Sequence, residues 1–392
     1  MEVNSSRPEY AILRDGGYPN STDYESNNYT ATAAPYRTFN YPYIPPAVLA
    51  AKVVSIALIV FITVVGNSIV IAIILSNKHM RTTTYFYLMN LAVADITIAM
   101  ISEWTWLANH LMDRWVFGDV MCKASFLLQG VSIQVSILTL TVVAGDRYFA
   151  ILHPLRSRVI KRNAGIIIGA VWLIAFLINI PMLLNVKHAT HTWDDGLDMA
   201  WCIEYWEGDD MDYQKLLRAV YTTLLFVAVY LLPLFLMSVT YTRIGCTLKS
   251  RSTHGPGVKV EATVSTQERS KRKVIKMLAV VVSIFAVCWL PYHILNLVQD
   301  WSANVEAQNI PKDLWFICTW LGYANSAMNP FVYCGFNENF RRGFVDAFTG
   351  RWCAGKKRQM VKCGKMATVK PNKSVCSSQV TEGTVVESTS ML

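Results

Sequence analysis

A carboxylic acid lies inside an apolar stretch of this sequence, at Asp95. A charged side chain is costly in an apolar environment, so its presence there marks a functional position by default. Polar residues of three other apolar stretches are its candidate partners: Asn67, Ser136, Asn325 and Asn329. Carboxylate, hydroxyl and amide oxygens are the ligands that small hard cations prefer. The set therefore predicts either a small-cation site or a hydrogen-bonded cluster that only fixes helix packing.

Groups for covalent catalysis do not accompany this acid. The sequence shows no paired nucleophile and base, and no histidines with metal-ligand spacing inside the apolar stretches. His188 and His191 lie among acids in a polar segment, where they could bind a metal ion, although plain solvation explains them better. We therefore predict that the protein is not an enzyme and carries no cofactor or metal beyond the small cation.

Seven apolar stretches hold these residues, and each has the ~20 residues that a tilted helix needs to cross a bilayer. They are Val48–Leu75, Tyr85–His110, Cys122–Ile151, Ala164–Leu184, Leu216–Leu248, Val274–Gln299 and Leu314–Tyr333. Of 392 residues, 16% are charged, whereas soluble domains have about 25%. The fifth stretch is apolar nearly all round, which favours lipid over a soluble bundle. We predict an all-α membrane protein, a seven-transmembrane helix bundle.

The charges between the stretches are sorted by sign. Basic residues lie between stretches three and four, between five and six, and after the seventh, whereas the segment between four and five is acidic. The positive-inside rule makes the basic side cytoplasmic and the N-terminus extracellular, in the plasma membrane. The net charge is +9. Because the basic residues lie in the segments on the cytoplasmic side, this charge does not indicate a nucleic-acid partner.

The bundle is predicted at residues 47–335, between two polar ends. Residues 1–46 show no signal-peptide pattern and carry N-glycosylation sequons at Asn4, Asn20 and Asn28, so we expect a disordered extracellular segment. Residues 336–350 have phenylalanines four apart with arginines between them, typical of a short amphipathic eighth helix in the membrane interface. Residues 351–392 are predicted to be a disordered cytoplasmic tail.

The tail contains candidate sites for modification and for partners. Cys353 and Cys363 follow the interfacial helix and are candidate palmitoylation sites, with bare thiols as the alternative. Phosphorylated serines and threonines of the tail would bind arrestin-type proteins. The chain ends at Leu392 in a pattern that fits a PDZ-domain ligand.

Three of the apolar stretches each contain a short motif. The third stretch ends in Asp146-Arg147-Tyr148, the sixth contains Cys288-Trp289-Leu290-Pro291, and the seventh ends in Asn329-Pro330 followed by Tyr333. Seven spans with these motifs resemble the rhodopsin-like family of G-protein-coupled receptors. The residues that this resemblance assigns to coupling and switching are Asp146, Arg147, Tyr148, Trp289, Pro291, Tyr241, Asn329, Pro330 and Tyr333.

The resemblance implies roles for these positions. Arg147 is expected to pair with Asp146 at rest and to engage a heterotrimeric G protein when active. A sodium ion at Asp95 is expected to favour the inactive state. Cys122 and Cys202 lie near the extracellular ends, where a disulfide is chemically allowed, and the resemblance implies the same pairing.

The predicted outer mouth excludes two classes of ligand. A retinal pigment needs a lysine in the core of the last span, but Lys312 lies only at its entrance. A monoamine receptor needs an acid about two turns into the third span, where this sequence has Gln129 and no acid. The acids and tryptophans of the mouth suit a basic peptide instead, through steering and cation–π contacts.

Finer resemblances favour one branch of peptide receptors. Cys202-Ile203-Glu204-Tyr205-Trp206 resembles a loop of receptors for RFamide peptides, and the whole looks most like the neuropeptide FF receptor branch. The resemblance implies that Asp300 meets the arginine of the peptide and that Gln129 bonds its terminal amide. The candidate ligand contacts are Gln129, Glu204, Trp206, Asp300, Trp106, His293 and Asn296.

Two departures leave the exact peptide open. Gly145 replaces a larger residue before Asp146, and Tyr292-His293 follow Pro291. An orexin-, tachykinin- or neuropeptide Y-like ligand is therefore an alternative. A transporter using Asp95 as an ion relay is a further alternative, but the sequence does not show the duplicated halves that are usual for transporters.

Overall fold

The computed structural model describes residues 44–80, 82–153, 163–192, 198–208, 210–253, 262–302 and 310–349. The chain divides into two compact units, one ending at Phe344 and one running from Val345 to Leu392. The predicted glycosylation, palmitoylation and PDZ positions lie outside the described residues and stay predictions; they are Asn4, Asn20, Asn28, Cys353, Cys363 and Leu392.

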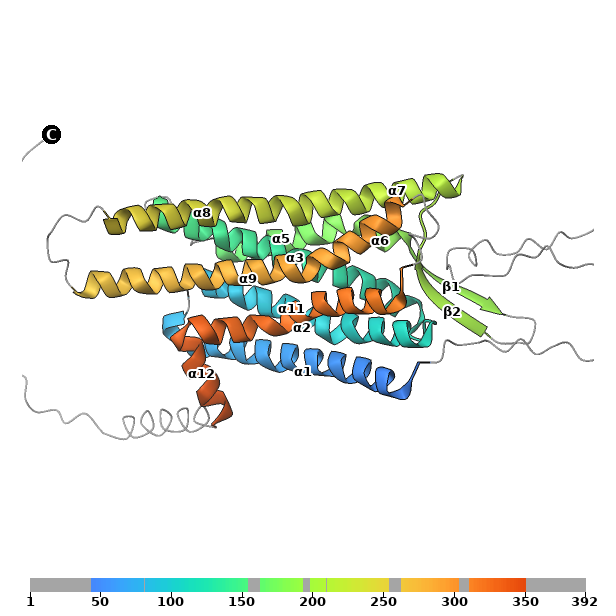
Figure 1. Cartoon of the computed structure of the whole chain (residues 1–392), viewed down its shortest axis with the longest axis horizontal. Coiled ribbons are helices and arrows are strands. Elements are labelled where there is room, and N and C mark those ends of the chain that lie inside the picture. Colours follow the sequence, from blue (N-terminus) through green and yellow to red (C-terminus); the bar gives the residue numbers. More distant parts are fainter. Residues whose placement is uncertain are drawn as a thin grey trace, which may run out of the picture. The chain divides into compact units, whose positions relative to one another are not determined.

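Long helices run side by side to form the bundle of the first unit (Figure 1). They are α1 (Pro46–Ser76), α2 (Thr83–Met112), α3 (Gly118–Leu152), α5 (Ala164–Ile178) with α6 (Ile180–Asn185), α7 (Met211–Leu225), α8 (Leu232–Thr253), α9 (Ala262–Trp301) and α11 (Lys312–Phe336). A π-helical segment, Phe226–Leu231, joins α7 to α8 into one long helix. All seven predicted spans are present, and the sixth extends furthest beyond its prediction, from Ala262 rather than Val274.

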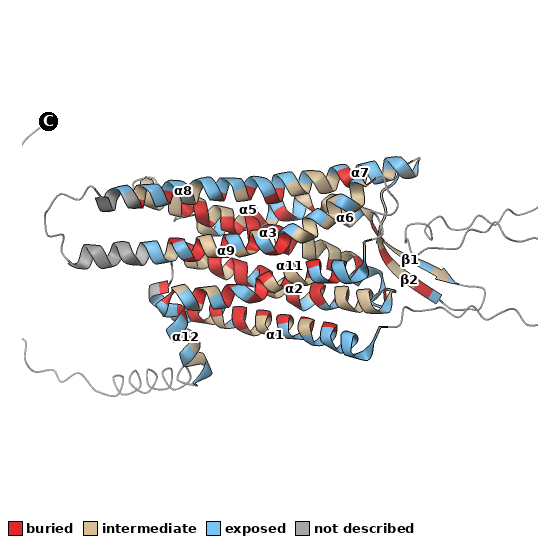
Figure 2. Cartoon of the chain, viewed as in Figure 1, coloured by how far each residue is buried: buried red, intermediate tan, exposed pale blue. Residues whose placement is uncertain are grey.

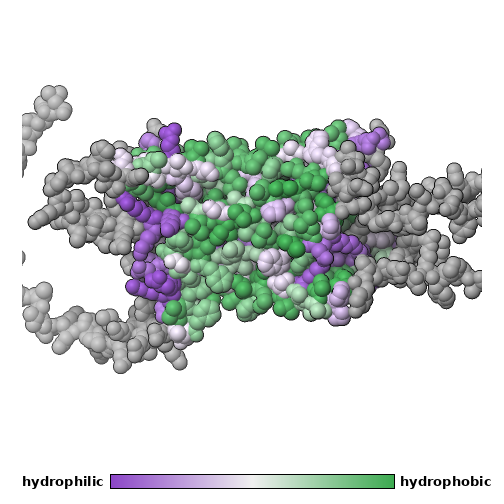
Figure 3. Space-filling view, viewed as in Figure 1, coloured by the Kyte–Doolittle hydropathy of each residue, from purple (hydrophilic) through white to green (hydrophobic). Residues whose placement is uncertain are grey.

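Length and composition agree with a membrane location. Within the described residues, six of these helices are long and apolar enough to cross a bilayer. The seventh, α11, has 25 residues but carries polar side chains such as Asn325 and Asn329 along its buried face. Figure 3 shows apolar residues across the middle of the bundle and hydrophilic residues near its two ends.

Prolines mark where helices begin and where they are weakened. Pro46 opens α1, where its missing N–H costs nothing, and Pro311 precedes α11. Pro291 and Pro330 instead lie inside α9 and α11, where each removes one backbone hydrogen bond. Buried residues line the inward faces of the helices and exposed ones their outer faces, as Figure 2 shows.

A β-hairpin lies between α6 and α7, and the all-α prediction missed it. Strand β1 (Val186–Thr192) pairs antiparallel with β2 (Asp198–Glu204), with His188 opposite Cys202. Cys202 forms a disulfide with Cys122 at the start of α3, as predicted. The hairpin is therefore fixed across one end of the bundle, hereafter the hairpin end (Figure 1).

The opposite end of the bundle is continued by α12 (Glu338–Phe348), slightly shorter than the predicted helix at 336–350. Phe340 is fully buried and its ring stacks on Tyr333, with 5.4 Å between centroids. It also meets the edge of Tyr85 at 5.8 Å. The end of α11 and the start of α12 are therefore anchored on α2.

Candidate ligand cavity and coupling residues

A cavity of about 360 Å³ opens at the hairpin end, between α2, α3, α7, α9, α11 and β2. Five of the seven predicted ligand contacts line it: Trp106, Gln129, Glu204, His293 and Asn296. The other two, Trp206 and Asp300, lie behind its wall and contact Glu204 and Arg218, which do line it. The structure thus brings the predicted contacts together around one space.

An arginine that the sequence analysis missed joins two of the predicted acids. Arg218 Nε of α7 lies 3.2 Å from Asp300 Oδ1 and 3.6 Å from Glu204 Oε2. Trp206 Nε1 donates a hydrogen bond of 2.6 Å to Glu204 Oε1. Arg218 shares a helical face with Tyr221 and Leu225, which also line the cavity. That spacing was the signal that could have identified it.

Aromatic rings pack together between α2 and α11, and one of them, Trp106, lines the cavity. Trp106 stacks on His110 at 5.4 Å and on Phe316 at 5.6 Å, and its edge meets Tyr323 at 5.5 Å. Tyr323 Oη donates a hydrogen bond of 3.2 Å to Gln129 Oε1. The nitrogen of the Gln129 amide group is thereby left as a donor for a ligand carbonyl.

The wall formed by α9 combines aromatic and amide groups. His293 lies 4.6 Å from the ring of Tyr230. Asn296 Nδ2 donates to the carbonyl oxygen of Tyr292 at 2.8 Å, so its Oδ1 stays an acceptor for a ligand. Both residues lie within two turns of Pro291, where the α9 backbone is weakened.

Trp289 lies deeper in the bundle, where α9 meets α11. Its side chain is 2% exposed and contacts the edges of Tyr292 and Tyr323 at 5.7 and 6.4 Å. A Cβ atom at Gly322 would lie 2.9 Å from the Trp289 ring. A glycine is therefore required there for the two helices to approach with this ring between them.

The predicted partners of Asp95 are only partly in direct contact with it. Asn329 Nδ2 donates a hydrogen bond of 2.8 Å to Asp95 Oδ2. Asn67 instead donates to the backbone carbonyls of Thr63 and Ser326, and Ser136 to that of Ser132. Two of the four predicted partners, Asn67 and Ser136, therefore donate to nearer backbone acceptors rather than to Asp95.

Two amide oxygens of the predicted set nevertheless remain without a hydrogen bond among the described residues. They are Asn67 Oδ1 and Asn325 Oδ1, both buried. Unpaired amide oxygens close to a buried carboxylate are the donor set that a sodium ion uses. The residues present therefore fit the predicted cation.

A second acid of α2 is buried without any predicted role. The side chain of Glu103 is fully buried, and neither of its carboxylate oxygens has a hydrogen-bond partner among the described residues. A buried carboxyl group without partners is costly to the fold.

The end of the bundle opposite the hairpin holds the Asp146-Arg147-Tyr148 motif. Arg147 and Asp146 form an ion pair, with Arg147 Nε 3.1 Å from Asp146 Oδ2. Thr84 Oγ1 of α2 donates to the same oxygen at 3.2 Å. The predicted pairing of Arg147 with Asp146 is therefore present. Tyr148 and Tyr241 pack beside it on an apolar cluster of Ile244, Leu248 and Ile275.

A comparison with known families gives this arrangement its context. The sequence model of the 7 transmembrane receptor (rhodopsin family) matches residues 66–333, from the last part of α1 to near the end of α11, and these residues include the whole lining of the cavity. The chain belongs to the rhodopsin family of seven-transmembrane receptors. Members of this family are receptors rather than enzymes, so the predictions of family and of a membrane-spanning receptor are confirmed.

Relatives of this receptor are themselves named for peptide ligands. Rat neuropeptide FF receptor 2 is 34% identical over 319 residues, which cover 79% of this chain and 75% of that protein. Human neuropeptide FF receptor 1 is 35% identical over 348 residues, covering 86% and 79%. Human neuromedin-K receptor is 32% identical over 325 residues, covering 82% and 66%.

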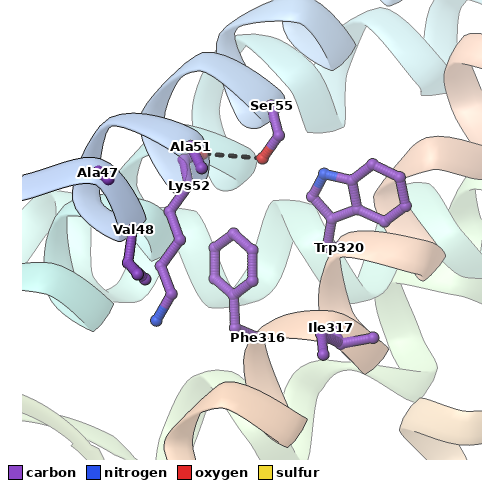
Figure 4. A pocket seen from close by; sticks show the side chains of 8 residues that line it. All are labelled: Ala47, Val48, Ala51, Lys52, Ser55, Phe316, Ile317 and Trp320. Carbon is purple, nitrogen blue, oxygen red and sulfur yellow. Dashed lines mark hydrogen bonds between the residues drawn. The ribbon is translucent and has the colours of Figure 1, made fainter. Parts of the chain in front are cut away.

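This receptor also has a groove on its outer face, between α1 and α11. Figure 4 shows its lining of Ala47, Val48, Ala51, Lys52, Ser55, Phe316, Ile317 and Trp320, with a volume of about 450 Å³. Lys52 Nζ pairs with Asp313 Oδ1 at 2.7 Å and lies 4.9 Å from the centre of the Phe316 ring. Phe316 in turn stacks on Trp106, so the two helices that form the groove also support the cavity wall.

Proposed function

We propose that this chain is a G-protein-coupled receptor for a basic, amidated peptide of the RFamide type. The observation that carries the proposal is the division of the cavity into two chemically different ends. At its outer part Glu204 lines the cavity and Asp300 lies just behind the wall, and its inner part has Gln129 among aromatic rings. An arginine followed by an amidated phenylalanine has the complementary groups in the same order. The names of the relatives support the same ligand class.

The peptide would enter from the hairpin end, which we assign to the extracellular side. Its guanidinium group would pair with Asp300 and Glu204, since a charge-assisted bond to carboxylate is the strongest that arginine makes. Its phenylalanine would pack among Trp106, His293 and neighbouring rings. Its amide would hydrogen-bond with Gln129 and Asn296. Trp206 would hold Glu204 in position through its ring N–H.

Transmission would follow contacts that join the cavity to the opposite end. A ligand pressing on Tyr292 or Tyr323 would move Trp289, because the ring touches both. Pro291 would let the lower part of α9 swing. Loss of a sodium ion at Asp95, and of the Asp146 pair, would then free Arg147 for a heterotrimeric G protein on the cytoplasmic side. Tyr241, Pro330 and Tyr333 would stabilise the rearranged helices.

The experiment that tests the proposal is a signalling assay in transfected cells. Calcium and cyclic AMP would be recorded with a panel of amidated peptides ending in Arg-Phe, with surface expression measured in parallel. Asp300→Asn should lower the potency for these peptides about tenfold or more, because it removes one charge of the pair. Arg147→Ala should abolish the response at unchanged peptide binding.

Glu207→Gln is the matched control for Asp300→Asn. Glu207 is an exposed acid that follows β2, and among the described residues its ion pair is with Lys187, at 3.0 Å. An equal loss in both variants would indicate general steering rather than a contact at Asp300. Silence of a well-expressed receptor toward the whole panel would reject the RFamide ligand. The tachykinin-type peptides would be next, since neuromedin-K receptors are also relatives.

The predicted arrestin contact, the PDZ contact at Leu392 and lipidation at Cys353 or Cys363 belong to the same proposal. Their residues lie outside the described part of the chain. Each needs its own test, such as arrestin recruitment after truncation at residue 350.

A further inference from the structure

The two acids assigned to a ligand's arginine already hold a guanidinium group of the chain itself. Arg218 Nε lies 3.2 Å from Asp300 Oδ1 and 3.6 Å from Glu204 Oε2. One cation therefore serves two carboxylates, from α9 and from β2, and the group keeps one negative charge in excess. A second guanidinium group that approaches the same oxygens meets the positive charge of Arg218.

The contacts of Arg218 are close but poorly oriented. Its Nε is buried and makes no geometrically acceptable hydrogen bond with any described residue, although it is within ion-pair distance of both acids. Asp300 Oδ2 is likewise buried without a hydrogen-bond partner among the described residues. Arginine bonds carboxylate best through two parallel N–H groups. Arg218 therefore leaves a carboxylate oxygen without a hydrogen bond. A guanidinium group with better orientation could bond to that oxygen.

The exposed fractions of the three side chains favour replacement of Arg218 by a cation that arrives from the cavity. The side chain of Asp300 is 2% exposed and that of Glu204 is 15% exposed, whereas that of Arg218 is 33% exposed. A cationic ligand therefore meets Arg218 before it meets the acids. Because like charges repel, the ligand reaches the acids only when Arg218 gives way.

Other bonds hold the surrounding elements without Arg218. Trp301 Nε1 at the end of α9 donates a hydrogen bond of 2.8 Å to Thr223 Oγ1 of α7. Trp206 Nε1 holds Glu204 through its other oxygen, Oε1. We therefore expect the acids and both helices to keep their positions when Arg218 leaves, and its main effect to be on charge rather than on architecture.

We propose that Arg218 is an internal competitor of the ligand. In the unliganded receptor it neutralises one charge of the Glu204–Asp300 pair, and the guanidinium group of the bound peptide replaces it. The inference rests on the proposed function, because it takes the ligand to be an arginine-containing peptide. It makes Arg218 a specificity-determining residue that lowers the affinity for arginine-containing peptides and so sets how strongly the receptor prefers them to neutral ones.

The test compares two peptides on two receptor variants. One peptide ends in Arg-Phe-amide and the other carries citrulline, a neutral isostere, in place of arginine. Arg218→Gln should raise the affinity for the arginine peptide about tenfold while leaving the affinity for the citrulline peptide unchanged. Lys215→Gln is the matched control, since Lys215 is an exposed cation one turn earlier on α7. It should leave the ratio of the two affinities at the wild-type value.

Each outcome separates this inference from the proposed function. Equal changes for both peptides in Arg218→Gln, or a loss of arginine-peptide affinity, would show a structural support and overturn the inference alone. No response to any arginine peptide, in wild type or variants at normal surface expression, would overturn the proposed function and the inference with it. If Arg218→Gln does not reach the surface, Arg218→Lys replaces it, with a smaller gain in the same direction expected from a point charge without the planar fork. If Arg218→Lys shows no gain in affinity for the arginine peptide, the proposal that Arg218 competes with the ligand is rejected.

Discussion

Asn329 of α11 donates a hydrogen bond of 2.8 Å to Asp95 of α2, and this bond joins residues 234 positions apart in the chain. It links the seventh helix directly to the buried acid of the second. The amide oxygens of Asn67 and Asn325 remain unpaired nearby among the described residues. A sodium ion would complete this group by using oxygens that the protein does not use.

Sodium should therefore weaken agonist binding to the wild-type receptor. We expect agonist affinity in sodium chloride to be about tenfold lower than in N-methylglucamine chloride of equal ionic strength, a typical coupling between two sites. Asp95→Asn should remove the difference, because a neutral amide binds the cation poorly. Radioligand displacement in the two salts measures the effect, and a sodium effect that persists in Asp95→Asn would reject the site.

Removing the charge of Glu103 should stabilise the receptor. The side chain is fully buried and both oxygens lack partners among the described residues, so Glu103→Met replaces a costly group by an apolar one of similar volume. We expect the midpoint of thermal unfolding in detergent to rise by about 2 °C or more. Glu338→Gln is the control: its acid is half exposed in pairs with Lys273 and Arg342, and such pairs contribute little. A lower midpoint for Glu103→Met would indicate an essential partner of this acid.

A methyl group at Gly322 should disturb Trp289. The added Cβ would lie 2.9 Å from the ring, which is rigid and buried, so the ring or α11 must shift. Gly322→Ala should cost about 1–3 kcal/mol of stability, as overpacking usually does, and should alter ligand-free signalling. Gly169→Ala on α5 is the matched control, because an added Cβ there meets nothing within 4 Å. Wild-type stability and signalling in Gly322→Ala would show that Trp289 is not held by this contact.

Breaking the Asp146 pair should raise signalling without ligand. Asp146→Asn removes the ion pair with Arg147 and leaves the guanidinium group free to move. Thr84→Val removes only the hydroxyl that bonds the same carboxylate oxygen at 3.2 Å, so its effect should be smaller in the same direction. Binding of a GTP analogue to G protein in membranes, without agonist, measures both. Equal basal activity in all three receptors would show that the pair does not restrain coupling.

The apolar stretches predicted the helices well because lipid demands long runs of apolar residues with internally satisfied backbones. The hairpin escaped prediction because β1 and β2 mix His, Lys, Thr and Asp without a clear alternation. Arg218 escaped because an arginine near a helix end is usually solvated. Its role depends on Asp300, which is 82 residues away and is brought close only by the fold.

The site predictions also differ in how much knowledge of the fold each one required. Asp146 and Arg147 are sequence neighbours, so their pairing needed little knowledge of the fold. The ring around Asp95 requires four helices to meet in one orientation, and there Asn67 and Ser136 bond to backbone carbonyls instead. The sequence indicated which residues lie near Asp95, but the hydrogen bond that each one makes depends on how its helix is rotated about its axis.

The π-helical segment Phe226–Leu231 sets that rotation for the long helix formed by α7 and α8. A π turn closes its hydrogen bond one residue later than an α turn, so deleting one residue there would turn everything after it by about 100°. Pro233 and Met237, now buried, would leave the core, while Arg218 and Tyr221 would still line the cavity. The number of residues in this helix, as well as their identity, therefore determines which side chains face the cavity at the hairpin end and which face the core at the opposite end of the bundle.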